Sequence, residues 1–96
     1  MSLVFESDQG KACANLRKHG ITFDEASSAF DDPFARIFVD EDHSGEELRE
    51  ILVGHSTANR LLLVCFREMT KDHIRIVSAR QATKKEQHDY EENVIS

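Results

Sequence analysis

The sequence is poor in proline, glycine, tryptophan and cysteine, and these scarcities exclude several classes of protein. One proline and four glycines in 96 residues argue against a linker or a low-complexity tract. The longest apolar run, Leu61 to Phe66, is much shorter than the ~20 residues that a membrane helix needs. With two cysteines and no export signal in the first residues, we expect a reduced, cytoplasmic protein without a disulfide framework.

The chain nevertheless contains enough apolar material for a small hydrophobic core. Hydrophobic residues make up 40% of the sequence and charged residues 31%, which is typical of a folded protein. At this length we expect one domain, spanning residues 1–96.

The net charge of −6 is distributed unevenly along the chain. Residues 1–48 carry four basic and eleven acidic side chains, a net −7, and residues 83–96 carry two and four, a net −2. Residues 49–82 carry six basic and three acidic side chains, a net +3. This cationic middle third is compatible with a local anion-binding site, or with the ordinary solvated face of a half-exposed sheet.

Two helices are predicted in the N-terminal third. Asp8 is a helix-capping residue, and Gly20 can end the first helix in a left-handed turn. Thr22 and Glu25 have the spacing of a capping box, which predicts the start of a second helix. That helix should end before Pro33, because the residue that precedes a proline disfavours the helical conformation.

The rest of the chain predicts strands followed by a third helix. Thr83 and Glu86 form a second capping box, and the helix should continue to about Asn93. Between Pro33 and Thr83 the β-forming segments are 35–40, 49–55, 61–67 and 74–80, with an acidic loop at 41–47. We therefore expect an α+β fold in which two N-terminal helices and one C-terminal helix pack on a four-stranded antiparallel sheet. The apolar run at 61–66 should be buried on both faces of that sheet.

No motif in the sequence indicates a metal or a cofactor. There is neither a CxxC pair nor an HxxxH pair among the histidines, which are His19, His43, His55, His73 and His88. The acidic cluster at 40–43 lacks calcium-loop spacing, and we interpret it as a solvated loop. Cys65 lies in an apolar strand without a neighbouring base, so we interpret it as a core residue rather than a nucleophile.

Arginines at the strand ends are the most informative charged residues. In a plain meander, Arg49, Arg67 and Arg75 fall at one edge of the sheet. Three guanidinium groups repel one another unless acidic groups or an anion join them. Glu50 and Glu68 could neutralise them, and an RNA phosphodiester is the functional alternative.

Two blocks of the sequence resemble the BrnT family of toxins, over roughly residues 5 to 90. The first block is Phe5-Glu6-x-Asp8-x-x-Lys11-Ala12-x-x-Asn15-x-x-Lys18-His19-Gly20-Ile21-x-Phe23-x-Glu25-Ala26. The second is Ile74-Arg75-Ile76-Val77-Ser78-Ala79-Arg80-x-Ala82-Thr83-x-x-Glu86-x-x-x-Tyr90. The resemblance implies a RelE-like fold and a type II toxin, a ribonuclease that inhibits translation. It also implies a BrnA-like antitoxin that contacts DNA, so that the toxin meets DNA only through its partner.

Metal-free RNA cleavage would use the ribose 2′-hydroxyl as nucleophile and leave a 2′,3′-cyclic phosphate. We expect the catalytic groups to be His19 with three arginines, because imidazole exchanges protons near neutral pH and guanidinium groups stabilise phosphate charge. The candidate catalytic residues are Arg67, Arg80, Arg75 and His19, and the candidate RNA-binding residues are Arg49, Lys11, Lys18 and Tyr90. Ser78 and Glu86 are assigned to structure, as a strand residue and a helix cap.

Two other hypotheses remain open on the sequence alone. His19 could simply stabilise the negative end of the first helix. The family usually has tryptophan where this chain has Ser7, and together with the net acidity this favours a toxin-like module that only binds its antitoxin and acts in operon regulation. A purely structural α+β protein would leave the cationic edge unexplained.

Overall fold

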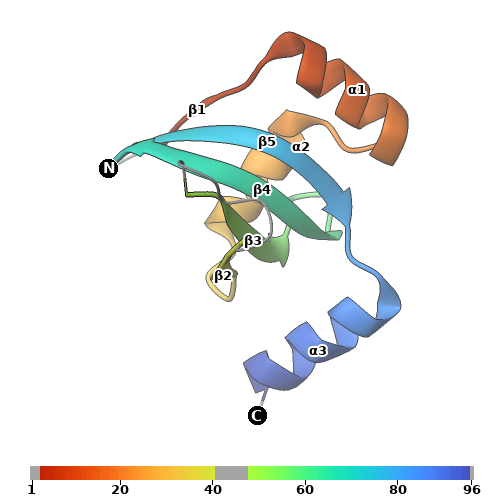
Figure 1. Ribbon diagram of the computed structural model, residues 1–96. Coiled ribbons are helices and arrows are strands. Elements are labelled where there is room, and N and C mark those ends of the chain that lie inside the picture. The colour runs from red at the N-terminus through yellow and green to blue at the C-terminus, as the bar shows by residue number, and fades with distance from the viewer. Residues whose placement is uncertain (1–2, 41–47, 96) are drawn as a thin grey trace.

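The computed structural model of the protein describes residues 3–40 and 48–95. A curved sheet forms its centre, with α1 and α2 on one side and α3 beyond the other (Figure 1). No helix in these ranges is long and apolar enough to cross a membrane. The elements in chain order are β1 (Val4–Glu6), α1 (Gln9–His19), α2 (Phe23–Ser28), the 3-10 turn η1 (Ala29–Asp31), β2 (Arg36–Val39), β3 (Glu50–His55), β4 (Leu61–Thr70), β5 (His73–Gln81) and α3 (Lys84–Ile95).

The sheet has five strands in the order β1-β5-β4-β3-β2. The antiparallel meander from β2 to β5 confirms the four predicted strands. The predicted strand number is wrong, because β1 adds a fifth strand that pairs in parallel with β5, with Val4 opposite His73. Three residues are too few to show an alternating pattern, and their partner lies far away in the chain. The predicted loop at 41–47 lies outside the described residues.

The first two helices begin and end as the local signals predict. Asp8 accepts a hydrogen bond from the backbone N–H of Lys11 at 3.1 Å, and Gly20 adopts a φ of 70° after the last turn of α1. Thr22 likewise accepts from the N–H of Glu25 at 3.1 Å. The second hydrogen bond of this predicted capping box, from the Thr22 N–H to the Glu25 carboxylate, is replaced. The carboxylate instead binds the Arg60 guanidinium, which is distant in the sequence.

At α3, by contrast, both halves of the capping box form. The Thr83 hydroxyl accepts from the Glu86 N–H at 3.2 Å, and the Glu86 carboxylate accepts from the Thr83 N–H at 2.9 Å. Glu86 is therefore fixed at the point where the chain leaves β5 and enters α3.

One face of the sheet is covered by α1, α2 and η1 over β3, β4 and β5, whereas β2 is exposed. Ile21, Phe23, Ala26, Ala29, Leu52, Leu62, Val64, Phe66, Ile74, Ile76 and Ala79 form the core between this face and the α1–η1 segment. The predicted burial of 61–66 on both faces is wrong for Leu63 and Cys65, which are only partly buried. Their side chains point to the opposite face, which we call the open face.

A β-bulge in β5 changes which residues reach the open face. Cys65 pairs with Ser78 and the next residue of β4 pairs with Ile76, so Val77 has no partner across the ladder. Ile76 and Ala79 are both buried on the helix side, although three positions separate them. The extra residue therefore turns both Val77 and Ser78 toward the open face.

The first helix is docked on the sheet through a buried polar side chain. Asn15 is 5% exposed, and its amide group donates hydrogen bonds to the carbonyl oxygens of Ile21 and Ala79, both at 2.9 Å. Its carbonyl oxygen accepts from the Ala79 N–H, also at 2.9 Å. One side chain thus fixes α1, the turn after it and the strand just past the bulge.

We predict that Asn15→Ala destabilises the protein by about 2–4 kcal/mol, because it leaves buried backbone groups of Ile21 and Ala79 without partners. For a domain of this size that corresponds to a fall in melting temperature of roughly 10 °C or more. Arg17→Ala, at an exposed position of the same helix, is the matched control and should change the melting temperature little. Equal melting temperatures for the two variants in calorimetry would contradict the assigned role of Asn15.

Candidate active site

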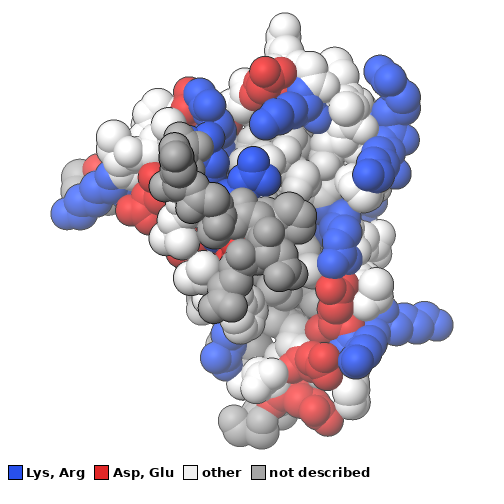
Figure 2. All heavy atoms as spheres, in the orientation of Figure 1, with Lys and Arg blue, Asp and Glu red and all other residues white. Residues whose placement is uncertain are grey.

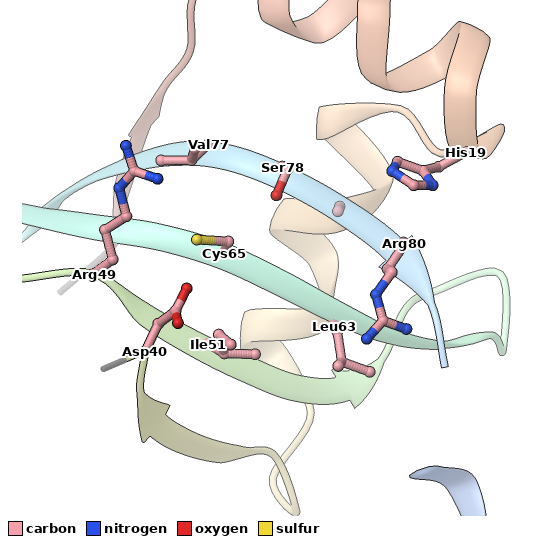
Figure 3. Close-up of a pocket in the computed structure, with 10 residues that line it drawn as sticks. His19, Asp40, Arg49, Ile51, Leu63, Cys65, Val77, Ser78 and Arg80 are labelled. Carbon is pink, nitrogen blue, oxygen red and sulfur yellow. The ribbon is translucent and has the colours of Figure 1, made fainter. Parts of the chain in front are cut away.

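A cleft of about 410 Å³ lies on the open face of the sheet. In Figure 3, Arg49 and Asp40 lie at one end of it and Arg80 and His19 at the other. Its floor is mainly apolar, and the lining residues are His19, Asp40, Arg49, Ile51, Leu63, Cys65, Val77, Ser78, Ala79 and Arg80. Three residues predicted from the sequence, His19, Arg49 and Arg80, thus come together around one hollow.

Each of these three side chains is positioned by the backbone segment that carries it. His19 ends α1, whose docking Asn15 fixes against β5. Arg80 follows the bulge at Val77, and the shifted alternation turns it to the open face. Arg49 directly precedes β3 and is hydrogen-bonded through its carbonyl to the Asp40 N–H at 2.9 Å.

Arg67 and Arg75 lie beside the cleft rather than in its lining. They are opposite one another on β4 and β5. The β3–β4 register, extended by one residue beyond Glu50 and Phe66, also sets Arg49 opposite Arg67. The three arginines therefore gather at one edge, as the meander predicts. The partner of Arg75 differs from the expected ones, because Glu6 of β1 binds its Nε at 3.1 Å.

Arg80 is held by a carboxylate that the sequence assigned only to helix capping. Its Nη1 and Nη2 donate to the two oxygens of Glu86, both at 2.8 Å. The hydrogen bonds from Arg80 lower the pKa of Glu86 to about 2, with smaller contributions from Thr83 and against the effect of burial. Two parallel N–H donors facing two oxygens is also the geometry with which arginine binds phosphate. Glu86 therefore belongs to the surroundings of the candidate site.

Cys65 lies in the floor of the cleft. Burial raises its pKa, and the charge of Asp40 raises it further, whereas Arg49 and Lys11 lower it. Figure 2 shows basic side chains over α1 and acidic ones gathered over α3. Lys18, also predicted to contact RNA, lies exposed in the last turn of α1.

Tyr90, a candidate RNA-binding residue, is not among the residues that line this cleft. It is 8% exposed on α3, and its hydroxyl is within hydrogen-bond distance of Asp32 at 3.2 Å and of the Phe34 carbonyl at 3.1 Å. Its ring meets that of His55 edge to face, with centroids 5.6 Å apart. A second hollow of about 420 Å³ separates this part of α3 from β2 and β3. Tyr90 therefore anchors α3 to the sheet.

Asp32 is the acceptor on which this anchor depends. Burial alone would raise the pKa of Asp32, but hydrogen bonds from the backbone of His55 and Phe34 and from the Tyr90 hydroxyl more than offset it and lower the pKa. The ionised carboxylate then acts back on Tyr90. Burial, with the charge and hydrogen bond of Asp32, raises the pKa of Tyr90 to about 12.

Sequence reasoning missed Asp40, Ser78, Cys65 and Glu86 as neighbours of the site. Ser78 faces the cleft because of the bulge in β5, which leaves no local signal in the sequence, whereas Cys65 faces it through the ordinary alternation of β4. Glu86 could have been found, since a capping glutamate six positions after an arginine has a second oxygen free for it. Within residues 3–40 and 48–95, no group of three or more His, Cys, Asp or Glu side chains could hold a metal ion.

Tyr90 is the single tyrosine of a chain without tryptophan, so its ionisation can be followed directly by ultraviolet absorbance. We predict a midpoint near pH 12 in the folded protein and near the ordinary value of about 10 in denaturant. Because the folded pKa is the higher one, this group stabilises the fold below about pH 10, and that contribution is lost as pH rises through about 12. The midpoint in the folded protein is measured by jumping the pH and recording the absorbance before the protein unfolds. A folded midpoint near 10 would show that α3 is not anchored through Asp32.

Comparison with known proteins identifies the family. Residues 8–86 match the family described as the ribonuclease toxin BrnT of type II toxin–antitoxin systems. No curated protein sequence matches the chain. The crystal structure of the Brucella abortus ribonuclease toxin BrnT is similar, with a TM-score of 0.62 and 20% identity over 88% of this chain and 99% of that one. At this identity the structural likeness shows a shared fold, whereas the match over residues 8–86 shows that the chain belongs to the BrnT family of ribonuclease toxins.

Proposed function

We propose that this toxin is a metal-independent endoribonuclease that acts in the cytoplasm and inhibits translation. The observation that carries the proposal is the meeting of His19, Arg49 and Arg80 around one cleft on the open face. An imidazole can exchange the protons of the reaction, and guanidinium groups can balance the charge that develops on phosphorus. In this scheme the 2′-hydroxyl attacks the phosphorus, the P–O5′ bond breaks, and a 2′,3′-cyclic phosphate and a 5′-hydroxyl remain.

The arrangement supports different roles for the individual cations. Arg80 and Arg49, at opposite ends of the cleft, bind the scissile phosphate and a neighbouring one. Arg67 and Arg75 extend this positive surface along β4 and β5. His19 acts as the acid or the base beside Arg80.

Binding of the RNA chain outside the cleft is assigned to α1. Lys11 and Lys18 are exposed on this helix and contact the RNA backbone. Tyr90 takes no part in RNA binding in this proposal, because its hydroxyl and ring are engaged in anchoring α3.

Type II toxins pair with an antitoxin protein, and we propose a BrnA-like partner with a basic DNA-binding part. The acidic side chains of the first 48 residues, net −7, and those gathered over α3 would attract such a protein (Figure 2). We likewise propose that the fold is RelE-like, as the resemblance to the BrnT family implies.

A second candidate function is an antitoxin-binding module with weakened catalysis. Glu86 already occupies two N–H donors of Arg80, and Ser7 stands where the family usually has tryptophan. RNA cleavage by the purified protein distinguishes this candidate from an active enzyme.

We predict that the purified toxin cleaves RNA in the presence of a chelator. Arg80→Ala, Arg67→Ala and His19→Ala should each lower the rate by at least about tenfold, because each removes a charge or a proton carrier from the site. Arg80→Lys tests whether bidentate binding of the phosphate is needed, since lysine keeps the charge but lacks the two parallel N–H donors. The 5′-hydroxyl ends should accept phosphate from polynucleotide kinase without prior dephosphorylation.

The matched control is Arg17→Ala, which removes an exposed cation of α1 outside the proposed site. It should cleave at the parental rate, and melting temperatures should show that all the variants are folded. Parental rates for the Arg80 and Arg67 variants alike would refute the site assignment. An inactive parent would favour the binding module.

We further predict that association of the toxin with its antitoxin is strongly salt-dependent. Attraction between an acidic toxin surface and a basic partner accelerates their encounter, so the on-rate should fall by at least about tenfold between low salt and 0.5 M salt. The off-rate should change much less. Stopped-flow mixing across a salt series measures both rates, and an on-rate independent of salt would mean that the contact is mainly apolar.

A further inference from the structure

The outermost strand of the meander, β2, is an edge with exposed apolar side chains. Ile37, Phe38 and Val39 are 54%, 56% and 51% exposed. β2 pairs with β3 on one side, and no strand among residues 3–40 and 48–95 pairs with its other side. An exposed apolar strand edge is a template for pairing with another strand, and most proteins protect such edges.

The backbone groups that this edge offers follow from the ladder with β3. The Asp40 N–H donates to the Arg49 carbonyl at 2.9 Å, and Arg36, Phe38 and Asp40 share the same phase of the alternation. In an antiparallel ladder every second residue bonds to the neighbouring strand. Ile37 and Val39 therefore direct their N–H and C=O groups to the unpaired side.

The residues 36–40 are self-complementary when the strand meets its own copy in antiparallel orientation. Pairing about Phe38 sets Arg36 opposite Asp40 of the second copy, Ile37 opposite Val39, and Phe38 opposite Phe38. Opposite charges and apolar pairs directly across two strands both stabilise a sheet. The strand carries one cation and one anion, so a second copy offers an opposite charge at both ends. A basic partner would instead be repelled by Arg36.

Hydrogen bonding selects this same register. The residues that must bond across the new edge are Ile37 and Val39, and pairing about Phe38 matches them with each other. If the register of the two strands shifted by one residue, Ile37 and Val39 would face residues whose backbone groups already bond to β3. A shift of two would break the contacts between Arg36 and Asp40. Charge, side-chain size and backbone bonding therefore agree on one arrangement.

We propose that β2 pairs with β2 of a second copy of this chain and joins the two sheets into one continuous sheet about a two-fold axis. Arg36 donates to the Asn93 carbonyl at 2.7 Å, and its guanidinium has further N–H donors for the carboxylate opposite. Asp40 interacts within its own chain, and its two oxygens allow a second cation to bind. The contact is small, so the dimer is reversible and depends on concentration.

The clefts of both copies then lie on the same side of the joined sheet, because a two-fold axis between antiparallel strands is perpendicular to the sheet. Phe38 is on the open face, with Ile51 opposite it on β3. The pair of Phe38 rings would continue the apolar floor between the two clefts. This proposal does not depend on the catalytic one, since no part of it uses a reaction.

Sedimentation velocity of the toxin alone, over a hundredfold range of concentration, tests the proposal. We expect a monomer–dimer equilibrium in the wild type. Arg36→Asp and Asp40→Arg should each be monomeric, because like charges then face one another at both ends of the strand pair. The double reversal R36D/D40R should dimerise again, and an equimolar mixture of the two single variants should form a mixed dimer.

Hydrogen exchange locates the contact. Amide exchange at Ile37 and Val39 should slow with concentration in the wild type and stay fast in each single variant. A monomer at every concentration would overturn the proposal, as would a dimer that both single reversals leave intact. Formation of the mixed dimer also shows that the single variants are folded. Strand pairing seen only after the antitoxin is added would assign the edge to that partner instead.

Discussion

The docking of α1 through Asn15 is the contact on which the rest of the arrangement depends. A buried amide that bonds both backbone groups of Ala79 holds the strand just after its bulge, and the same side chain holds the turn at Ile21. A polar contact at this point allows one geometry only, whereas an apolar one would tolerate sliding of the helix. The ends of α1 and β5 are thereby brought together, although they are far apart in the sequence.

Helices pack on one face of the sheet and leave most of the open face accessible, so one face contains the core and the other contains the candidate site. The helix side contains the core, and its residues are explained by packing alone. The open face combines apolar floor residues such as Leu63 with charged residues at both ends, such as Arg49 and Arg80. Partial burial strengthens the interactions of these charges, and their solvent access still admits a large ligand.

Features encoded within a few residues could be predicted from the sequence, and features that depend on distant pairing could not. The caps at Asp8, Thr22 and Thr83 are contacts over three residues, and all three form. The strand β1 and the bulge at Val77 exist only because of pairing with distant residues. The predicted meander accounts for the gathering of Arg49, Arg67 and Arg75. Arg80 reaches the cleft through the bulge and His19 through the docking of α1, and the sequence predicted neither of these features.

The position of Tyr90 relative to the cleft also depends on contacts between distant residues. Its position in the family pattern gave no information about which surface α3 would place it on. The contacts that decide this, with Asp32 and Phe34, lie more than fifty residues away in the chain. Sequence spacing predicts which residues share a helix face, but the packing of that face on the sheet is a property of the whole fold.

Glu86 both caps α3 and binds Arg80, and this double role couples substrate affinity to helix stability. On the proposed assignment, a phosphate that takes the two donors of Arg80 removes the ion pair that joins the first turn of α3 to β5. Coupling of this kind is reciprocal: the free energy by which a bound phosphate weakens the docking of α3 equals that by which docked α3 weakens the phosphate. A protein that binds α3 and stabilises its docked position would then inhibit the toxin without contacting the cleft.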